Sequence, residues 1–214
     1  MLRVEVGGAT LVLLPERAVY VPDLQTLLVA DVHVGKASSF RSLGVPVPRG
    51  TTAGTLDRLS AVLAASGARR LVVLGDLVHA RRSFTLETLQ ALQRWRMVHE
   101  ALSITLLRGN HDRRSGDPPR DLAIDVVDEP LALGPYQLLH EPRERPEGYV
   151  LAGHVHPSTV VGGNGFDRMR LPCFHFGARV GVLPAFGEFT GSHTLAREPA
   201  DRVFAIADGR VHAV

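Results

Sequence analysis

The sequence holds a single cysteine, Cys173, among its 214 residues. One thiol cannot form a disulfide within the chain, and it cannot build the cysteine-rich site of a structural zinc ion. No apolar run approaches the ~20 residues of a membrane-spanning helix. The first residues alternate apolar and polar side chains, without the basic-then-apolar layout of a signal peptide. These absences predict a cytoplasmic chain that does not cross a membrane.

A strong net charge is also missing. The 24 Lys and Arg residues nearly balance 22 Asp and Glu, which leaves a formal charge of +2. No global positive field therefore indicates nucleic-acid binding, and local basic clusters must carry any such inference. The hydrophobic fraction of 45% and charged fraction of 21% are typical of a globular protein. At this length we predict a single domain over residues 1–214.

The order of predicted elements changes halfway along the chain. Apolar runs predict strands at residues 2–6, 9–14, 18–20, 24–30, 71–74 and 104–107. Helices are predicted at 51–66 and 85–102, and loops at 112–120 and at 35–50, where there is room for one helical turn. Strands dominate afterwards, at residues 123–127, 137–139, 149–152, 169–174, 203–207 and 211–214. This order favours an α/β domain in which two sheets pack face to face with helices outside.

The second predicted helix carries a stripe of large apolar residues. Leu86, Leu89, Leu92 and Trp95 recur at helical spacing, and Val98 extends the stripe. We interpret this face, including Trp95, as part of the core.

Side chains of the metal-ligand type follow five of the predicted strands. In an α/β sheet the carboxyl ends of the strands gather along one edge, where ligands bind. Residues far apart in sequence are therefore expected to meet there. They are Asp31 and His33, Asp76, Asn110 and His111, His140, and His154 and His156.

The donor types favour two divalent cations over one. Carboxylate, imidazole and amide groups together suit manganese, iron or zinc. One ion needs three or four ligands, and this set offers about twice that number. Two ions roughly 3.5–4 Å apart share a bridging carboxylate and serve in-line displacement at phosphorus. Each stretch alone also reads as a polar turn or a surface histidine, but the five in one order favour a bimetal site.

The ordered motifs resemble those of the calcineurin-like metallophosphoesterases. The resemblance rests on Asp31-Val-His33, Gly75-Asp76, Gly109-Asn-His-Asp112, His140 and Gly153-His-Val-His156, and spans about residues 26–158. It implies a four-layer αββα sandwich of two mixed sheets, with the site at the sheet edges. It also implies a metal-dependent phosphoesterase.

A narrower resemblance covers nearly the whole chain. The carrying stretches are Leu28–Lys36, Gly153–Pro157, Leu171–Phe174, Leu183–Gly187 and Phe189–Gly191, which are similar to the DNA-ligase-associated metallophosphoesterases. The stretch Gly75–His79 with Gly109–Asp112 is also similar to the nuclease branch that processes DNA breaks. This implies a DNA phosphodiesterase or nuclease in bacterial DNA repair, functionally associated with an ATP-dependent DNA ligase.

The resemblance assigns roles residue by residue. One metal would take Asp31, His33, Asp76 and His156, and the second would take Asp76, Asn110, His140 and His154. His111 would face the phosphate, stabilising its charge or protonating the leaving oxygen, while Asp112 orients His111. Water activated by the two cations would attack phosphorus. Mn²⁺ is the preferred ion, with Fe²⁺ or Zn²⁺ as alternatives.

Basic residues lie close after the expected ligands. Lys36, Arg81, Arg82 and Arg113 are expected to rim the cleft and contact substrate phosphates, and His79 joins them as a substrate or supporting residue. The plainer interpretation of each is a solvated loop residue. No aromatic residues alternate with these basic residues, so the sequence does not indicate a surface on which bases would stack.

The sequence alone is also compatible with two other functions. A small-molecule phosphatase or cyclic-nucleotide phosphodiesterase would use the same scaffold. A non-catalytic repair scaffold would be expected to have lost ligands, and every ligand position is filled here. The sequence is compatible with several metals, with endo- or exo-cleavage, and with a homodimer.

Overall fold

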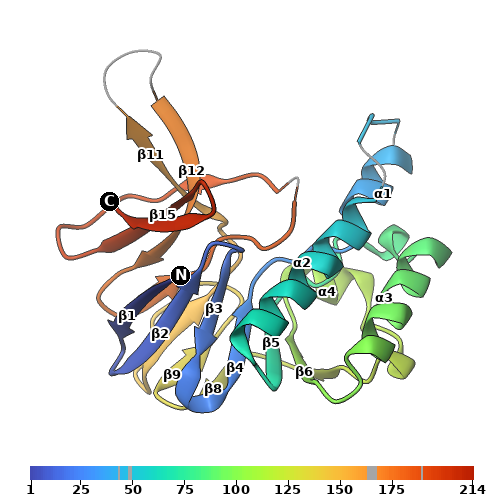
Figure 1. Ribbon diagram of the computed structural model, residues 1–214, viewed down its shortest axis with the longest axis horizontal. Helices are drawn as coiled ribbons and strands as arrows, with labels where there is room; N and C mark the ends of the chain where they lie inside the picture. The colour runs from blue at the N-terminus through green and yellow to red at the C-terminus, as the bar shows by residue number, and fades with distance from the viewer. Residues whose placement is uncertain (43, 48–49, 163–167, 189) are drawn as a thin grey trace.

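The first half of the chain builds one sheet from seven strands (Figure 1). A computed structural model describes residues 1–42, 44–47, 50–162, 168–188 and 190–214. The strands follow chain order across the sheet: β1 (Leu2–Val6), β2 (Ala9–Leu14), β3 (Ala18–Val21), β4 (Thr26–Val29), β5 (Arg70–Leu74), β6 (Ser103–Leu107) and β7 (Asp125–Val127). Hairpins make β1 to β4 antiparallel, whereas β4 to β7 are parallel because crossovers join them.

The helices gather on one side of this sheet, as Figure 1 shows. They are α1 (Lys36–Ser42), α2 (Thr51–Ser66), α3 (Leu86–Val98) and α4 (Asn110–Ser115), with 3-10 turns at Pro22–Leu24, Arg81–Ser83 and Arg120–Leu122. The α3 helix begins where the Thr85 hydroxyl accepts the backbone N–H of Thr88 at 3.2 Å. Leu59 of α2 and Leu92 of α3 pack in one core cluster with Val73 of the sheet.

The second half of the chain builds a mixed sheet. Its strands are β8 (Leu131–Leu133), β9 (Tyr136–Leu138), β10 (Tyr149–Ala152), β11 (Pro157–Gly162), β12 (Arg168–Phe176), β13 (Val180–Val182), β14 (His193–Thr194), β15 (Arg202–Ala207) and β16 (Arg210–Ala213). The order is β14-β11-β12-β13-β10-β9-β8, and β15 joins β12 to β16. Leu28 and Leu74 share a core cluster with Phe174 and Phe176, which buries the contact between the two sheets.

The expected α/β fold with two mixed sheets is confirmed, but the fourth layer is not. Every helix in the described part of the chain lies before residue 123, so the described helices cover the first sheet alone. Tight hairpins join β8 to β9, β12 to β13 and β15 to β16, and these connections are too short to hold a helix. The structure therefore has three layers over the residues that it describes.

Two predicted loops contain helices. Helix α1 occupies seven residues of the expected loop at 35–50, although residues 43, 48 and 49 lie outside the described ones. Helix α4 includes the start of the expected loop at 112–120. It begins at Asn110 because the Asp112 carboxylate accepts the N–H of Gly109 at 3.0 Å, which satisfies a free donor at the helix start.

The apolar stripe of α3 is rotated from its expected position. Leu86 and Val98 are 73% and 78% exposed, whereas Thr88 and Leu92 are buried. Trp95 is partly buried against the core, as expected. The buried face follows residues 88, 92 and 95, because the helix axis and its neighbours decide which side is covered. Among the described residues, no helix is long and apolar enough to cross a membrane.

Candidate metal centre

The predicted ligands meet where strands of both sheets end. Asp31 and His33 follow β4 and Asp76 follows β5, and these neighbours are tied by backbone bonds from Asp31 N–H to the Gly75 carbonyl (3.2 Å) and from His33 N–H to the Asp76 carbonyl (2.9 Å). From the second sheet, the His154 N–H donates to Asp31 Oδ2 at 2.8 Å. The site therefore sits across the contact between the sheets, at one end of both.

The side chains form two clusters of metal-ligand type. In the first, one ligand atom from each of Asp31, His33 and His156 lies within 4.8 Å of the others. In the second, Asp76, His140 and His154 meet the same limit. Two adjacent carboxylate-imidazole clusters suit a binuclear metal site.

The first cluster leaves polar atoms without partners. Asp31 Oδ1 and His33 Nδ1 are buried and form no hydrogen bond, although Asp31 is 0% and His33 5% exposed. His156 Nε2 lies 3.4 Å from Asp31 Oδ1, and its Nδ1 donates to the Gly191 carbonyl at 3.0 Å. Buried polar atoms are costly when unpaired, so their convergence fits a bound cation.

The second cluster gathers three possible metal ligands around His140. Its Nδ1 donates to the Leu74 carbonyl at 3.0 Å, which directs Nε2 toward the other ligands. Nε2 lies 2.9 Å from Asn110 Oδ1, 3.1 Å from His154 Nδ1 and 3.6 Å from Asp76 Oδ1. Asn110, which the sequence predicted as an oxygen ligand, therefore lies with this cluster.

The electrostatics of the site also favour cations. Burial lowers the pKa of His33 to about 2, and the charge of Lys36 acts in the same direction, so the imidazole is neutral and able to bind a metal. Burial, aided by the charge of Asp31, raises the pKa of Asp76. For His156, burial acts to lower the pKa, but the negative charge of Asp31 beside the ring outweighs this effect and raises the value. A divalent cation would relieve the repulsion between the two buried carboxylates.

Two glycines permit this close approach. A Cβ added to Gly75, whose φ is +79°, would collide with the His140 ring. A Cβ on Gly109 would collide with the Asp76 carboxylate. The glycines of the Gly-Asp and Gly-Asn-His-Asp motifs are therefore needed so that ligand side chains can pass the backbone.

His111 lies beside the second cluster, and its ring is held by a different group from the one predicted. Its Nδ1 donates to the His79 carbonyl at 2.6 Å, which leaves Nε2 facing Asp76 Oδ2 at 4.0 Å. The expected contact from Asp112 is wrong. That carboxylate instead accepts the N–H groups of Asp76 (2.7 Å), Val78 (3.3 Å) and Gly109 (3.0 Å). Asp112 therefore links the ends of β5 and β6, and the His79 carbonyl takes the place expected of Asp112 at the His111 ring.

His79 packs into the same group of rings. Its imidazole stacks on His111 with ring centroids 4.9 Å apart, and it meets the His33 ring edge-on at 5.3 Å. Burial lowers the pKa of His79 to about 4, assisted by the Lys36 charge. His79 is therefore a neutral neighbour that supports both His33 and His111 by contact.

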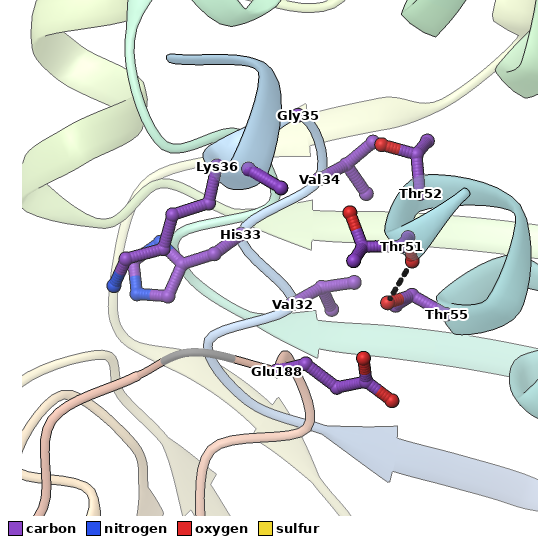
Figure 2. Close-up of a pocket in the computed structure, with 10 residues that line it drawn as sticks. Val32, His33, Val34, Gly35, Lys36, Thr51, Thr52, Thr55 and Glu188 are labelled. Atoms are coloured by element: carbon purple, nitrogen blue, oxygen red, sulfur yellow. Dashed lines mark hydrogen bonds between the residues drawn. The ribbon is translucent and has the colours of Figure 1, made fainter. Parts of the chain in front are cut away.

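The predicted basic residues differ in their surroundings. Figure 2 shows the His33 ring and the Lys36 chain on one side of residues 32–35, with Thr51 and Glu188 on the other side, around a small pocket. Arg81 and Arg82 are exposed in a 3-10 turn. Arg113 forms a salt bridge with Asp128 at 2.9 Å. Lys36 is thus the predicted cation with the clearest approach to the clusters.

Sequence reasoning missed the groups that hold the ligands from behind. The Glu129 carboxylate accepts the backbone N–H of His140 at 2.7 Å. The N–H of Gly187 donates to the Asp31 carbonyl at 3.0 Å, and Gly191 anchors His156 as described above. The stretch around Gly187 carried a family signal without a role, whereas no pattern links Glu129 to a residue eleven positions away.

Comparisons with known proteins agree with this geometry. A scan of protein families matches residues 24–189 to the calcineurin-like phosphoesterases. The crystal structure of Pseudomonas putida nuclease MPE is 45% identical, with a TM-score of 0.88, over 100% of this chain and 99% of that one. The phosphoesterase Yfce from E. coli is 16% identical over 88% of this chain and 97% of that one, at a TM-score of 0.42 that adds no support. A search of curated proteins finds no match.

Three findings lead to one assignment: the family match spans most of the chain, the alignment with the nuclease covers nearly all of both chains, and the structure holds two Asp/His clusters. This chain belongs to the calcineurin-like phosphoesterase family of metal-dependent enzymes, in the branch that includes nuclease MPE.

Proposed function

We propose that this chain hydrolyses phosphodiester bonds in DNA with the help of two divalent metal ions. The observation that carries the proposal is the pair of adjacent clusters, Asp31/His33/His156 and Asp76/His140/His154. The 45% identical relative is a nuclease, which supports DNA as the substrate. The resemblance to the ligase-associated group supports a role in bacterial DNA repair beside an ATP-dependent DNA ligase.

The proposed ligand sets follow the sequence motifs. Asp31, His33, Asp76 and His156 would hold one cation, and Asp76, Asn110, His140 and His154 would hold the other. We propose Mn²⁺, because mixed imidazole, carboxylate and amide donors suit this ion, with Fe²⁺ or Zn²⁺ as alternatives. When bound, the cations supply positive charge that acidifies water and offsets the charge of the phosphate.

His111 would act on the substrate rather than on a cation. The hydrogen bond from Nδ1 to the His79 carbonyl fixes the ring, so Nε2 is the atom available to the phosphate or the leaving oxygen. A protonated Nε2 would stabilise the developing negative charge and donate its proton to the departing oxygen. Asp112 supports this step indirectly, since it fixes the backbone at Asp76 and Gly109.

Cations around the cleft would hold the polyanionic strand. Lys36 lies beside His33, and Arg81 and Arg82 are exposed close after Asp76 in sequence. Arg113 would have to leave Asp128, or bind a phosphate and Asp128 at the same time. Phosphate contacts of this kind position a strand without reading its sequence.

A direct test compares the parent with His111→Ala on bis-p-nitrophenyl phosphate and on DNA, with Mn²⁺ added. The parent is expected to hydrolyse both substrates. Loss of one positioned acid lowers kcat by about 10²–10⁴-fold. Metal content measured by mass spectrometry should remain at two ions per chain in both proteins.

His212→Ala is the matched control, because this exposed histidine lies on β16, away from the clusters. It should keep the parent rate. A parent that holds two metal ions but cleaves neither substrate would contradict the proposal. Activity on phosphate monoesters or cyclic nucleotides without DNA cleavage would replace DNA with a small-molecule substrate.

A further inference from the structure

A basic groove opens beside the first cluster. Of the predicted catalytic, metal-binding and substrate-binding residues, His156 is the one that lines it. Its volume is about 170 Å³, against roughly 30 Å³ for one water molecule. Arg17 and Arg170 supply its charge, and Thr190 and Ser192 supply hydroxyl groups. No acidic residue is among the described residues that line the groove. This bias is local, because the chain as a whole is nearly neutral.

Arg17 is a half-buried cation that lies close enough to Glu188 for the charge of that carboxylate to act on it. Its Nη1 reaches the carbonyls of Ala185 and Gly187 at 3.4 Å each, which are long hydrogen bonds. In the part of the chain that the structure describes, Arg17 forms no salt bridge. A partly desolvated cation with weak partners favours an anionic ligand.

Arg170 enters the groove from the hairpin of β11 and β12. The strand register places Arg170 opposite Val160 and Arg168 opposite Gly162. Successive side chains alternate between faces, so both arginines project from the same face of the hairpin. Figure 1 shows these two strands extending beyond the rest of their sheet. The positive face therefore continues outward from the groove.

The groove and the first cluster share one side chain. His156 lines the groove, while its Nε2 faces Asp31 and its Nδ1 is fixed by Gly191, another lining residue. An anion in the groove would thus lie next to a phosphate held at the clusters. A small phosphodiester has no second phosphate to place there, whereas a nucleic-acid strand has one at every nucleotide.

We infer that this groove binds a phosphate of the DNA strand next to the scissile one, with Arg17 and Arg170 as its cationic residues. The inference rests on the proposed function at the clusters and names the polynucleotide backbone as the substrate feature recognised. The hairpin face with Arg168 and Arg170 guides the strand away from the site. Recognition through phosphates makes the contact independent of base sequence.

The test uses Arg170→Ala and Arg170→Glu, since Arg170 is exposed and its replacement leaves the Arg17 contacts intact. Affinity for a labelled single-stranded oligonucleotide is measured in the His111→Ala background, so that cleavage is suppressed. Loss of one phosphate contact should weaken binding several-fold at low salt and lower the slope of log Kd against log salt by about one. The charge reversal should weaken binding further.

Arg94→Ala on α3 is the matched control, because Arg94 is exposed on the opposite layer. It should keep the parent affinity and salt slope. With His111 restored, the ratio of kcat/KM on DNA to kcat/KM on bis-p-nitrophenyl phosphate should fall several-fold for Arg170→Ala and stay constant for Arg94→Ala.

Three results would overturn the inference: an unchanged Kd and salt slope, an equal fall on both substrates, or a parent that binds no DNA. Failure of the proposed function is a separate outcome. It would appear as a metal-loaded parent that hydrolyses neither substrate, and the binding comparison would still decide whether the groove contacts phosphate.

Discussion

At the scale of single residues, the site is built from unusual backbone conformations. Five of the seven proposed metal ligands have positive φ: Asp31 (+52°), His33 (+48°), Asp76 (+55°), His154 (+70°) and His156 (+49°). Residues other than glycine rarely adopt this region, and each instance costs on the order of 1–3 kcal/mol. The bonds around Asp31 and His156 hold these conformations in place. Backbone strain is thus concentrated where side chains must be turned toward the clusters.

The approach of His140 to Gly75 gives a prediction at this scale. Gly75→Ala should reduce metal content and phosphodiesterase activity at least tenfold, because the new Cβ collides with the His140 ring and φ is positive there. Metal content is measured by mass spectrometry and folding by circular dichroism.

Gly54→Ala provides the comparison. Gly54 lies within α2, and a Cβ there meets no atom within 4 Å. This variant should retain its metal ions and gain about 0.5–1 kcal/mol of stability, because alanine favours a helix. Equal metal content in the two variants would show that Gly75 does not position His140.

The sequence identified ligand types but not their orientation. Asp31 and Asp76 could be named because a carboxylate after an apolar run at a sheet edge is a recognisable pattern. Asp112 could not be placed, because its partners include the amides of Asp76 and Val78, more than thirty residues away. Arg17 gave no signal, since its importance arises from the groove that distant strands create.

At the scale of elements, apolar content decided which strands could be predicted. Strands β4, β5 and β6 are buried almost throughout and were predicted close to their observed bounds. Strands β8 and β13 span three residues each, which is too short for a periodic signal. Strand β11 has two buried positions and then alternates half-buried and exposed ones. Helix α4 was missed because it depends on the cap from Asp112.

A buried pair joins two elements of the second sheet. His175 on β12 lies 2.8 Å from the Asp201 carboxylate, just before β15. Burial acts to raise the pKa of Asp201, but hydrogen bonds from the Glu198 N–H and His175 outweigh it and hold the value below its usual range. The lowered pKa means that Asp201 stabilises the fold above about pH 4 and ceases to do so as it is protonated at lower pH.

Asp201→Asn should therefore lower Tm by roughly 2–8 °C at pH 7, since it removes a charge-assisted hydrogen bond worth about 1–2 kcal/mol. The difference from the parent should shrink as the pH falls below about 4. Scanning calorimetry at several pH values measures both effects. Asp208→Asn, in the turn between β15 and β16, should change Tm by no more than about 2 °C. A Tm difference that does not depend on pH would contradict the role of the carboxylate charge.

At the scale of the whole molecule, each cluster joins the two sheets. Asp31, His33 and Asp76 follow strands of the first sheet, whereas His140, His154 and His156 follow strands of the second. A bound cation therefore links the halves of the chain and also offsets two buried carboxylates. Stability should depend on metal binding more strongly than in a protein whose ligands come from one element.

Chelation tests this coupling. Removing the metal should lower Tm by about 5–10 °C, because saturation at a hundredfold excess over Kd adds about 2.7 kcal/mol. Differential scanning fluorimetry with EDTA, followed by added Mn²⁺, measures the loss and its recovery. Asp31→Asn should respond less to EDTA, because it has lost a ligand of the first cluster. A parent Tm that EDTA leaves unchanged would show that the metals do not link the sheets.

The distribution of ligands along the chain also bears on biosynthesis. Translation delivers Asp31, Asp76 and Asn110 long before His140, His154 and His156, and neither cluster is complete until the last of its histidines has been added. An unfinished polypeptide, or a fragment left by premature termination, would thus carry no intact centre. On the proposed function, a hydrolase assembled in this way would stay inactive toward nucleic acids until most of the chain has been made.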